Sequence, residues 1–224
     1  MLHGGPCPDF AVLAARGIRF AVLSCSAGMG WADPRFAEKI LSAKRAGILC
    51  GAYHRLTAES PEEAIRESDF FLSCLSSSPV SPRWALCRLE PGLPLRDPAG
   101  LPLLWGIFRE RIRRAGYEPL LYTTEKYLRY FPERVGRNLC LAAWGIPESR
   151  ALTRNPLFWE YGEGSVGPLS RAVLLKGYIT SLPDSGGDVP FLGEKSMGNG
   201  EPGTKNSVQW KKAVIFPRSC RYTV

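Results

Sequence analysis

The 224-residue chain is 45% hydrophobic and 22% charged, a composition typical of a folded globular protein and outside the range of wholesale disorder. A bilayer-spanning helix needs about 20 apolar residues in a row. The longest apolar runs, such as residues 101–108, are shorter and are interrupted by proline and glycine, so we expect no membrane span. The net charge of +8 is the unusual feature, and it suggests a polyanionic partner.

Short β-rich runs alternate with helical patterns along most of the chain. The runs expected to form strands are residues 18–24, 48–54, 84–90, 119–123, 139–144 and 157–161. Helical patterns occupy residues 34–46, 61–75 and 101–115, the first two with Asp33 and Ser60 as expected N-caps. This alternation predicts a parallel sheet with crossover helices. The number of units favours a closed (β/α) barrel over an open sheet, which stays as the alternative.

The composition changes after residue 182. Residues 183–224 are rich in glycine, proline, serine and charge, which predicts a flexible or weakly ordered tail behind a barrel domain of residues 1–182. One apolar stretch in the tail, residues 208–216, has the character of a strand able to dock onto the domain.

The chain offers few residues for metal or redox chemistry. Its two histidines, His3 and His54, exclude most multi-histidine metal sites, and we expect neither a metal nor a cofactor. The seven cysteines contain no CxxC pair and several lie in apolar runs, so we expect reduced, buried thiols.

Several segments, in order and at matching spacing, resemble the lysozymes of glycoside hydrolase family 25, which cut peptidoglycan. They are Asp9-Phe10, Gly28-x-Gly30, Asp33-Pro34-x-Phe36, Gly51-Ala52-Tyr53-His54, Asp69-Phe70-Phe71-Leu72, the run from Glu118 to Thr123, Leu141-Ala142-Ala143-Trp144 and Trp159-Glu160-Tyr161. The resemblance covers roughly residues 9–162. It implies a (β/α) barrel with its site at the carboxyl ends of the strands, in agreement with the strand and helix pattern.

The resemblance implies that Glu90 is the general acid of a carboxylate cluster that cleaves the glycosidic bond. In the family an Asp lies two residues before this Glu, whereas this sequence has Arg88 there. Residues two apart on a strand face the same side, so both side chains point toward the site. An adjacent arginine lowers the pKa of a carboxyl group and makes it a poorer acid near neutral pH. Arg88 therefore predicts weak or absent hydrolysis.

Two further departures concern the first and last strands of the family pattern. The sequence ahead of Asp9 is too short to supply the first strand and its carboxylate, so we expect a barrel that lacks this strand. At the last strand the simplest alignment puts Leu174 where the family has an Asp. Asp188 is a second match, which requires an insertion before it.

Other residues at the predicted strand ends are candidates for substrate contact. The resemblance implies that Tyr53, Tyr122, Trp144, Trp159 and Tyr161 stack on sugars, although aromatic residues also fill ordinary cores. Glu160 adds a possible carboxylate to the site, or pairs with Arg88. His54 is expected to be a hydrogen-bonded wall residue rather than a ligand for substrate hydroxyls.

The sequence leaves two main functions open: a muramidase acting on the peptidoglycan backbone, and a non-catalytic relative that binds glycan or has a structural role. A third, nucleic-acid binding, has only the basic run Arg109–Arg114 to support it, and we expect that run to be a solvated helix face. The N-terminus lacks the pattern of a secretory signal. We therefore expect a protein that stays in the cytoplasm until release, or reaches the cell wall by another route.

Overall fold

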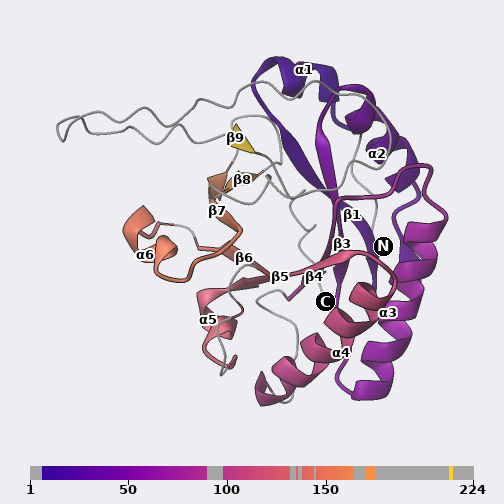
Figure 1. Ribbon diagram of the computed structural model, residues 1–224, viewed down its shortest axis with the longest axis vertical. Helices are drawn as coiled ribbons and strands as arrows, with labels where there is room; N and C mark the ends of the chain where they lie inside the picture. Colours follow the sequence, from indigo (N-terminus) through magenta and orange to yellow (C-terminus); the bar gives the residue numbers. More distant parts are fainter. Residues whose placement is uncertain are drawn as a thin grey trace, which may run out of the picture.

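The computed structural model describes residues 7–89, 98–131, 135, 138–143, 145–163, 170–174 and 212–213. They form an α/β fold around one sheet with the strand order β2-β1-β3-β4-β5-β6-β7-β8-β9 (Figure 1). The strands are β1 (Phe20–Ala27), β2 (Trp31–Ala32), β3 (Leu49–Arg55), β4 (Trp84–Arg88), β5 (Glu118–Thr124), β6 (Leu139–Ala142), β7 (Phe158–Glu163), β8 (Ser170–Leu174) and β9 (Lys212–Ala213). The six central strands, from β1 and β3 through to β7, are all parallel, as the strand and helix alternation predicts.

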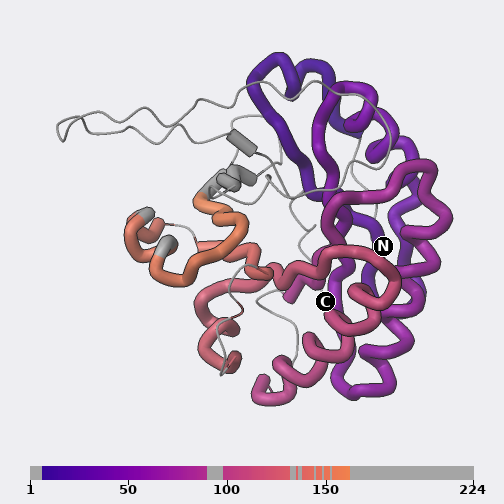
Figure 2. Tube along the Cα trace, viewed as in Figure 1, coloured from indigo at the N-terminus to yellow at the C-terminus, as the bar shows by residue number. Residues whose placement is uncertain are grey.

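Helices connect the parallel strands and cover their outer face. They are α1 (Phe10–Ala15), α2 (Phe36–Arg45), α3 (Pro61–Ser76), α4 (Leu101–Arg114), α5 (Glu125–Leu128) and α6 (Glu148–Leu152), with a short 3-10 turn η1 (Pro98–Gly100). Figure 2 shows successive strand and helix units following one another around a common centre, from indigo through magenta to orange, as in a (β/α) barrel. Within the described part of the chain, no helix is long and apolar enough to cross a membrane.

The sheet separates two layers of buried side chains. The inner layer contains Phe20, Val22, Tyr53, Trp84, Leu86, Leu120, Tyr122, Cys140, Ala142, Leu157 and Phe158. The larger outer layer lies between the sheet and helices α1 to α4, and it includes Phe71 and Phe108. Because side chains alternate along a strand, each strand contributes to both layers. The inner layer leads directly to the carboxyl ends of the parallel strands.

The two ends of the sheet differ from its parallel centre. On the side away from β3, β1 pairs with β2 only at Ser26 and Ala27, so most of its edge carries no other described strand. At the opposite end, β8 pairs antiparallel with β7 and with β9. Strand β9 lies within the apolar stretch at residues 208–216, which the sequence predicts to dock as a strand. The remainder of the expected tail lies outside the described residues.

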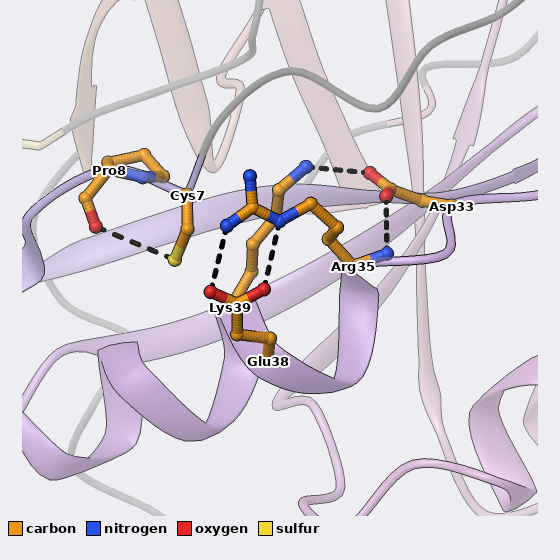
Figure 3. A network of polar contacts seen from close by, with 6 residues as sticks. All are labelled: Cys7, Pro8, Asp33, Arg35, Glu38 and Lys39. Carbon is orange, nitrogen blue, oxygen red and sulfur yellow. Dashed lines mark hydrogen bonds and ion pairs between the residues drawn. The ribbon is translucent and has the colours of Figure 1, made fainter.

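The start of α2 differs from the expected capping. Ser60 caps α3 as predicted, since its hydroxyl accepts a hydrogen bond from the Glu63 amide, but Asp33 is not the N-cap of α2. The helix begins at Phe36, and the Asp33 carboxylate accepts hydrogen bonds from the Arg35 amide and, at 2.8 Å, from Lys39 Nζ (Figure 3). Asp33 and Lys39 are both buried, so this ion pair fixes the turn between β2 and α2.

Candidate functional site

The carboxyl ends of β3, β4, β5 and β7 bring one group of polar side chains to the inner face of the sheet, which we call the bowl. Arg88 lies two residues after Leu86, and Glu160 lies two residues after Phe158. Since Leu86 and Phe158 belong to the inner layer, Arg88 and Glu160 face the same side, together with Tyr53 and Tyr122 of that layer. The bowl therefore unites Tyr53, Tyr122 and Glu160, three of the residues expected there, with Arg88.

Arg88 occupies the middle of this group. Its guanidinium carbon lies 4.9 Å from the ring centroid of Tyr53 and 5.0 Å from that of Tyr122. The residue is only 7% exposed, so these cation–π contacts form in a largely desolvated setting, where they are stronger than at the surface. The two tyrosine rings hold the positive charge at the position where the family pattern has a carboxylate.

Tyr122 also links Arg88 to Glu160. The Tyr122 hydroxyl donates a hydrogen bond of 2.9 Å to Glu160 Oε2, and Glu160 is 3% exposed. Burial raises the pKa of Tyr122 well above its usual range; the Glu160 carboxylate adds to this rise and the Arg88 charge opposes it. Tyr122 is therefore a neutral donor that stabilises the buried carboxylate.

Arg55, which is not among the residues predicted for the site, also belongs to the bowl. It is the residue opposite Arg88 in the parallel ladder between β3 and β4. Tyr53 lies two residues before it and is part of the inner layer, so Arg55 faces the bowl as well. Arg55 could have been predicted from the sequence, because side chains alternate along a strand and Arg55 lies two residues after Tyr53.

The structure does not bring Trp159 and Tyr161 to the bowl. Trp159 packs in an outer cluster with Leu139, Leu141, Ala143 and Ala151, and its indole N–H donates to the Ala143 carbonyl at 3.0 Å. Tyr161 is exposed and its ring lies 5.5 Å from that of Trp159. Trp159 and Tyr161 directly precede and follow Glu160 on β7, and because side chains alternate along a strand they lie on the opposite face. Trp159 and Tyr161 therefore lie outside the bowl, and their contact with sugars stays a prediction.

His54 lies on the outer face and is fully buried. Its Nε2 is 2.9 Å from Glu67 Oε2 and its Nδ1 is 2.8 Å from the Ser26 hydroxyl. An ionised carboxylate only accepts hydrogen bonds, so His54 Nε2 donates to Glu67, while Nδ1 shares its bond with the Ser26 hydroxyl. Glu67 also accepts from the amide and hydroxyl of Thr57. This is the hydrogen-bonded wall histidine that the sequence predicts, and it connects β1, β3 and α3.

Three other expected site residues, Glu90, Trp144 and Asp188, lie outside the described residues. Leu174, in the position of a family Asp in the simplest alignment, falls in β8. The cysteines that lie in strands are buried thiols, and burial raises the pKa of Cys87 and of Cys140 well above the usual range.

Parallel strands, crossover helices and a polar bowl at the strand ends define an α/β protein of the barrel type. The family model for glycosyl hydrolases family 25 matches residues 7–167, and the chain belongs to this family. None of the curated proteins compared with the chain matches it.

Solved structures of lysozymes and endolysins share the fold. The CTP1L endolysin is 19% identical, with a TM-score of 0.62 over 76% of this chain and 61% of its own. The bacterial lysozyme from Streptomyces coelicolor is 18% identical, with a TM-score of 0.59 over 80% of this chain and 91% of its own. The modular Cpl-1 endolysin, complexed with a peptidoglycan analogue, is 20% identical, with a TM-score of 0.57 over 92% of this chain and 57% of its own. The chain thus spans about three fifths of the length of the two endolysins.

Proposed function

We propose that this protein is a lysozyme-like domain that binds the glycan backbone of peptidoglycan in the bowl and does not hydrolyse it efficiently. Membership of family 25 supports a cell-wall glycan as the ligand. The structural likeness to an endolysin complexed with a peptidoglycan analogue is in keeping with this ligand. The observation that carries the proposal is Arg88, buried between Tyr53 and Tyr122 on the inner face.

The chemistry of the bowl argues against efficient hydrolysis. A glycosidase of this kind needs a carboxylic acid that keeps its proton near neutral pH, and a second carboxylate to stabilise positive charge on the sugar. Arg88 places a positive charge in the bowl, where both the proton-donating acid and the second carboxylate would have to act. It lowers the proton affinity of nearby carboxyl groups and repels an oxocarbenium-like transition state. Glu160, the described carboxylate of the bowl, already accepts a hydrogen bond from Tyr122.

The second candidate is an active muramidase with Glu90 as the general acid. Family membership favours it, and Glu90 directly follows the buried Leu89 at the end of β4. In this case Arg88 would reduce the rate without abolishing it. Release of reducing ends from peptidoglycan by the unmodified protein separates the two candidates: an active muramidase releases them and its Glu90→Gln variant does not, whereas a silenced site releases none in either form.

Nucleic-acid binding through α4 has less support. Arg111 pairs with Asp69 of α3, and Arg113 and Arg114 both pair with Glu110, so much of the positive charge on this helix is compensated locally. A solvated helix face, as the sequence predicts, explains the run.

Sedimentation with purified peptidoglycan tests the proposed function. The wild-type protein is expected in the wall pellet, and a soluble neutral oligomer of N-acetylglucosamine is expected to release it in part. Arg88→Asp and Arg109→Asp change the same charge inside and outside the bowl, so only the first should alter the bound fraction. Failure of the wild-type protein to sediment would overturn the proposed function.

A further inference from the structure

Two cysteine side chains meet between the sheet and helix α3. Cys25 lies in β1 and Cys74 in α3, and both pack in the outer layer of buried side chains. Helix α3 contacts β1 on this side of the sheet (Figure 1). The two thiols are hydrogen-bonded to each other, and neither is part of a disulfide. The fold thus joins two reduced sulfurs that lie far apart in the sequence, with α2 and β3 between them.

The sheet-facing side of α3 accounts for this contact. Glu67 and Cys74 are seven residues apart, or about two helical turns, so they share one face of the helix. Glu67 bonds to His54 of β3, and the other ring nitrogen of His54 bonds to Ser26 of β1, the residue after Cys25. These buried hydrogen bonds hold the face that carries Cys74 against the part of β1 that carries Cys25.

The two thiols differ in proton affinity and in exposure. A hydrogen bond from Cys25 lowers the pKa of Cys74 to about 7, whereas the contact with Cys74 and burial raise the pKa of Cys25. Cys74 is partly exposed, and Cys25 is 1% exposed. Oxidants attack the thiolate and need access to it. Cys74 is therefore the thiol that an oxidant meets first, and Cys25 is a protected thiol in contact with it.

The other described thiols lack this combination. Cys50, Cys87 and Cys140 are buried, and burial raises the pKa of each. Cys7 is partly exposed, but burial raises its pKa as well. Among the described cysteines, Cys74 alone is both partly exposed and substantially ionised near neutral pH.

We propose that hydrogen peroxide converts Cys25 and Cys74 into a reversible disulfide that joins β1 to α3. The Cys74 thiolate attacks one peroxide oxygen, the O–O bond breaks, and the departing hydroxide takes up the proton that Cys74 lost on ionising. The Cys25 sulfur then attacks the sulfur of the Cys74 sulfenic acid, and the S–O bond breaks. This second hydroxide leaves as water with the Cys25 proton. Two electrons pass from the sulfurs to the peroxide, and a dithiol reductant restores both thiols.

The disulfide should stabilise the fold without involving the bowl. It closes the long loop that contains α2 and β3, which limits the freedom of the unfolded chain. The oxidised protein should therefore unfold at a temperature higher by about 5 °C or more than the reduced protein. Both cysteines lie on the outer side of the sheet, so this inference is independent of glycan binding in the bowl.

Peptide mapping of the full chain tests the disulfide. The folded protein is treated with a small excess of hydrogen peroxide, its free thiols are blocked with N-ethylmaleimide before unfolding, and the digest is analysed without reductant. The main product should be the peptide pair linked through Cys25 and Cys74, and dithiothreitol should separate it. Cys7→Ser, at another partly exposed thiol, is the matched control and should give the same linked pair.

Two variants test the order of the steps. In Cys25→Ala the sulfenic acid of Cys74 has lost the thiol that resolves it, so dimedone should trap it. In Cys74→Ser the Cys25 thiol should stay reduced, and the rise in unfolding temperature should disappear. Circular dichroism accompanies each variant; if Cys25→Ala does not fold, the wild-type mapping and Cys74→Ser decide the result.

Other outcomes would overturn the proposal. They are a Cys74 that stays unreacted in the wild-type protein, one that dimedone traps there without a linked pair, and one that links to a different cysteine. The last case includes Cys220, which lies outside the described residues. Equal unfolding temperatures of the oxidised and reduced proteins would contradict the link between β1 and α3.

Discussion

The Arg88 guanidinium lies 5.0 Å from the ring centroid of Tyr122, whose hydroxyl in turn donates a hydrogen bond to Glu160. One tyrosine thus contacts a buried positive charge with its ring and a buried negative charge with its hydroxyl. This arrangement stabilises both charges without requiring a direct contact between them.

Removal of the Tyr122 hydroxyl should destabilise the protein measurably. In Tyr122→Phe a buried oxygen of Glu160 loses its donor, which costs about 1–3 kcal/mol of unfolding free energy. Urea denaturation measures the difference. Tyr161→Phe, which removes a hydroxyl from an exposed tyrosine, should change the value by less than about 0.5 kcal/mol. Equal effects of the two substitutions would show that the Tyr122 bond contributes nothing to stability.

The buried pair of Asp33 and Lys39 should behave differently from the exposed pair beside it. Asp33→Asn or Lys39→Met leaves an uncompensated buried charge and should cost about 3–5 kcal/mol, while the double variant should recover part of this loss. Arg35 and Glu38 form an exposed pair beside it (Figure 3), and Glu38→Gln should cost at most about 1 kcal/mol. Additive losses in the Asp33 and Lys39 double variant would contradict the assigned pairing.

The network around Glu67 should secure α3 to the sheet. Glu67→Gln weakens the hydrogen bonds to His54 and to Thr57, and we expect a loss of at least about 2 kcal/mol in unfolding free energy. Glu62→Gln, at an exposed position on the same helix, is the matched control and should be nearly neutral. Thermal unfolding followed by circular dichroism distinguishes the two; an undiminished midpoint for Glu67→Gln would argue against this role.

Cys74 should be the most reactive of the described thiols near neutral pH. A hydrogen bond from the Cys25 thiol lowers the pKa of Cys74 to about 7, against the opposing effect of burial. The thiolate is the reactive form, so the rate of alkylation by iodoacetamide should rise with pH and reach half its maximum near pH 7. Peptide mapping by mass spectrometry follows each cysteine separately.

The substitution Cys25→Ala provides the control for the reactivity of Cys74. It removes the thiol that donates to Cys74, so the pH midpoint of Cys74 alkylation should move to a higher value. A midpoint that is the same in both proteins would show that Cys25 does not set the reactivity of Cys74. Cys87 and Cys140 should stay unmodified throughout, because burial raises the pKa of each thiol well above its usual range and excludes the reagent.

The strand and helix pattern could be predicted closely from the sequence because local signals determine it. The run expected at residues 48–54 is strand β3 (Leu49–Arg55), and the helix expected at residues 101–115 is α4 (Leu101–Arg114). The pattern predicts Asp33 as the N-cap of α2, which is wrong because the Asp33 carboxylate pairs with Lys39 and the helix begins only at Phe36. The Arg35 N–H and the Lys39 ammonium both donate to this one carboxylate, and a sequence pattern does not reveal that arrangement.

The composition of the bowl was only partly predictable. Trp159 and Glu160 are adjacent on one strand, so they face opposite sides, and Trp159 cannot share the bowl with Glu160. The same rule applied to Tyr53 identifies Arg55. The contact of Arg88 with two tyrosines was beyond prediction, because it joins strands that are far apart in the sequence and depends on their register.

The central claim, that the bowl binds peptidoglycan without efficient hydrolysis, is tested most directly by the release of reducing sugar ends from purified peptidoglycan. The protein should be retained in the wall pellet and release no more reducing ends than its Glu90→Gln variant. Arg88→Asp, assayed in parallel, reports whether the arginine silences the site. Release by the unmodified protein that disappears in Glu90→Gln would contradict the account and establish an active muramidase.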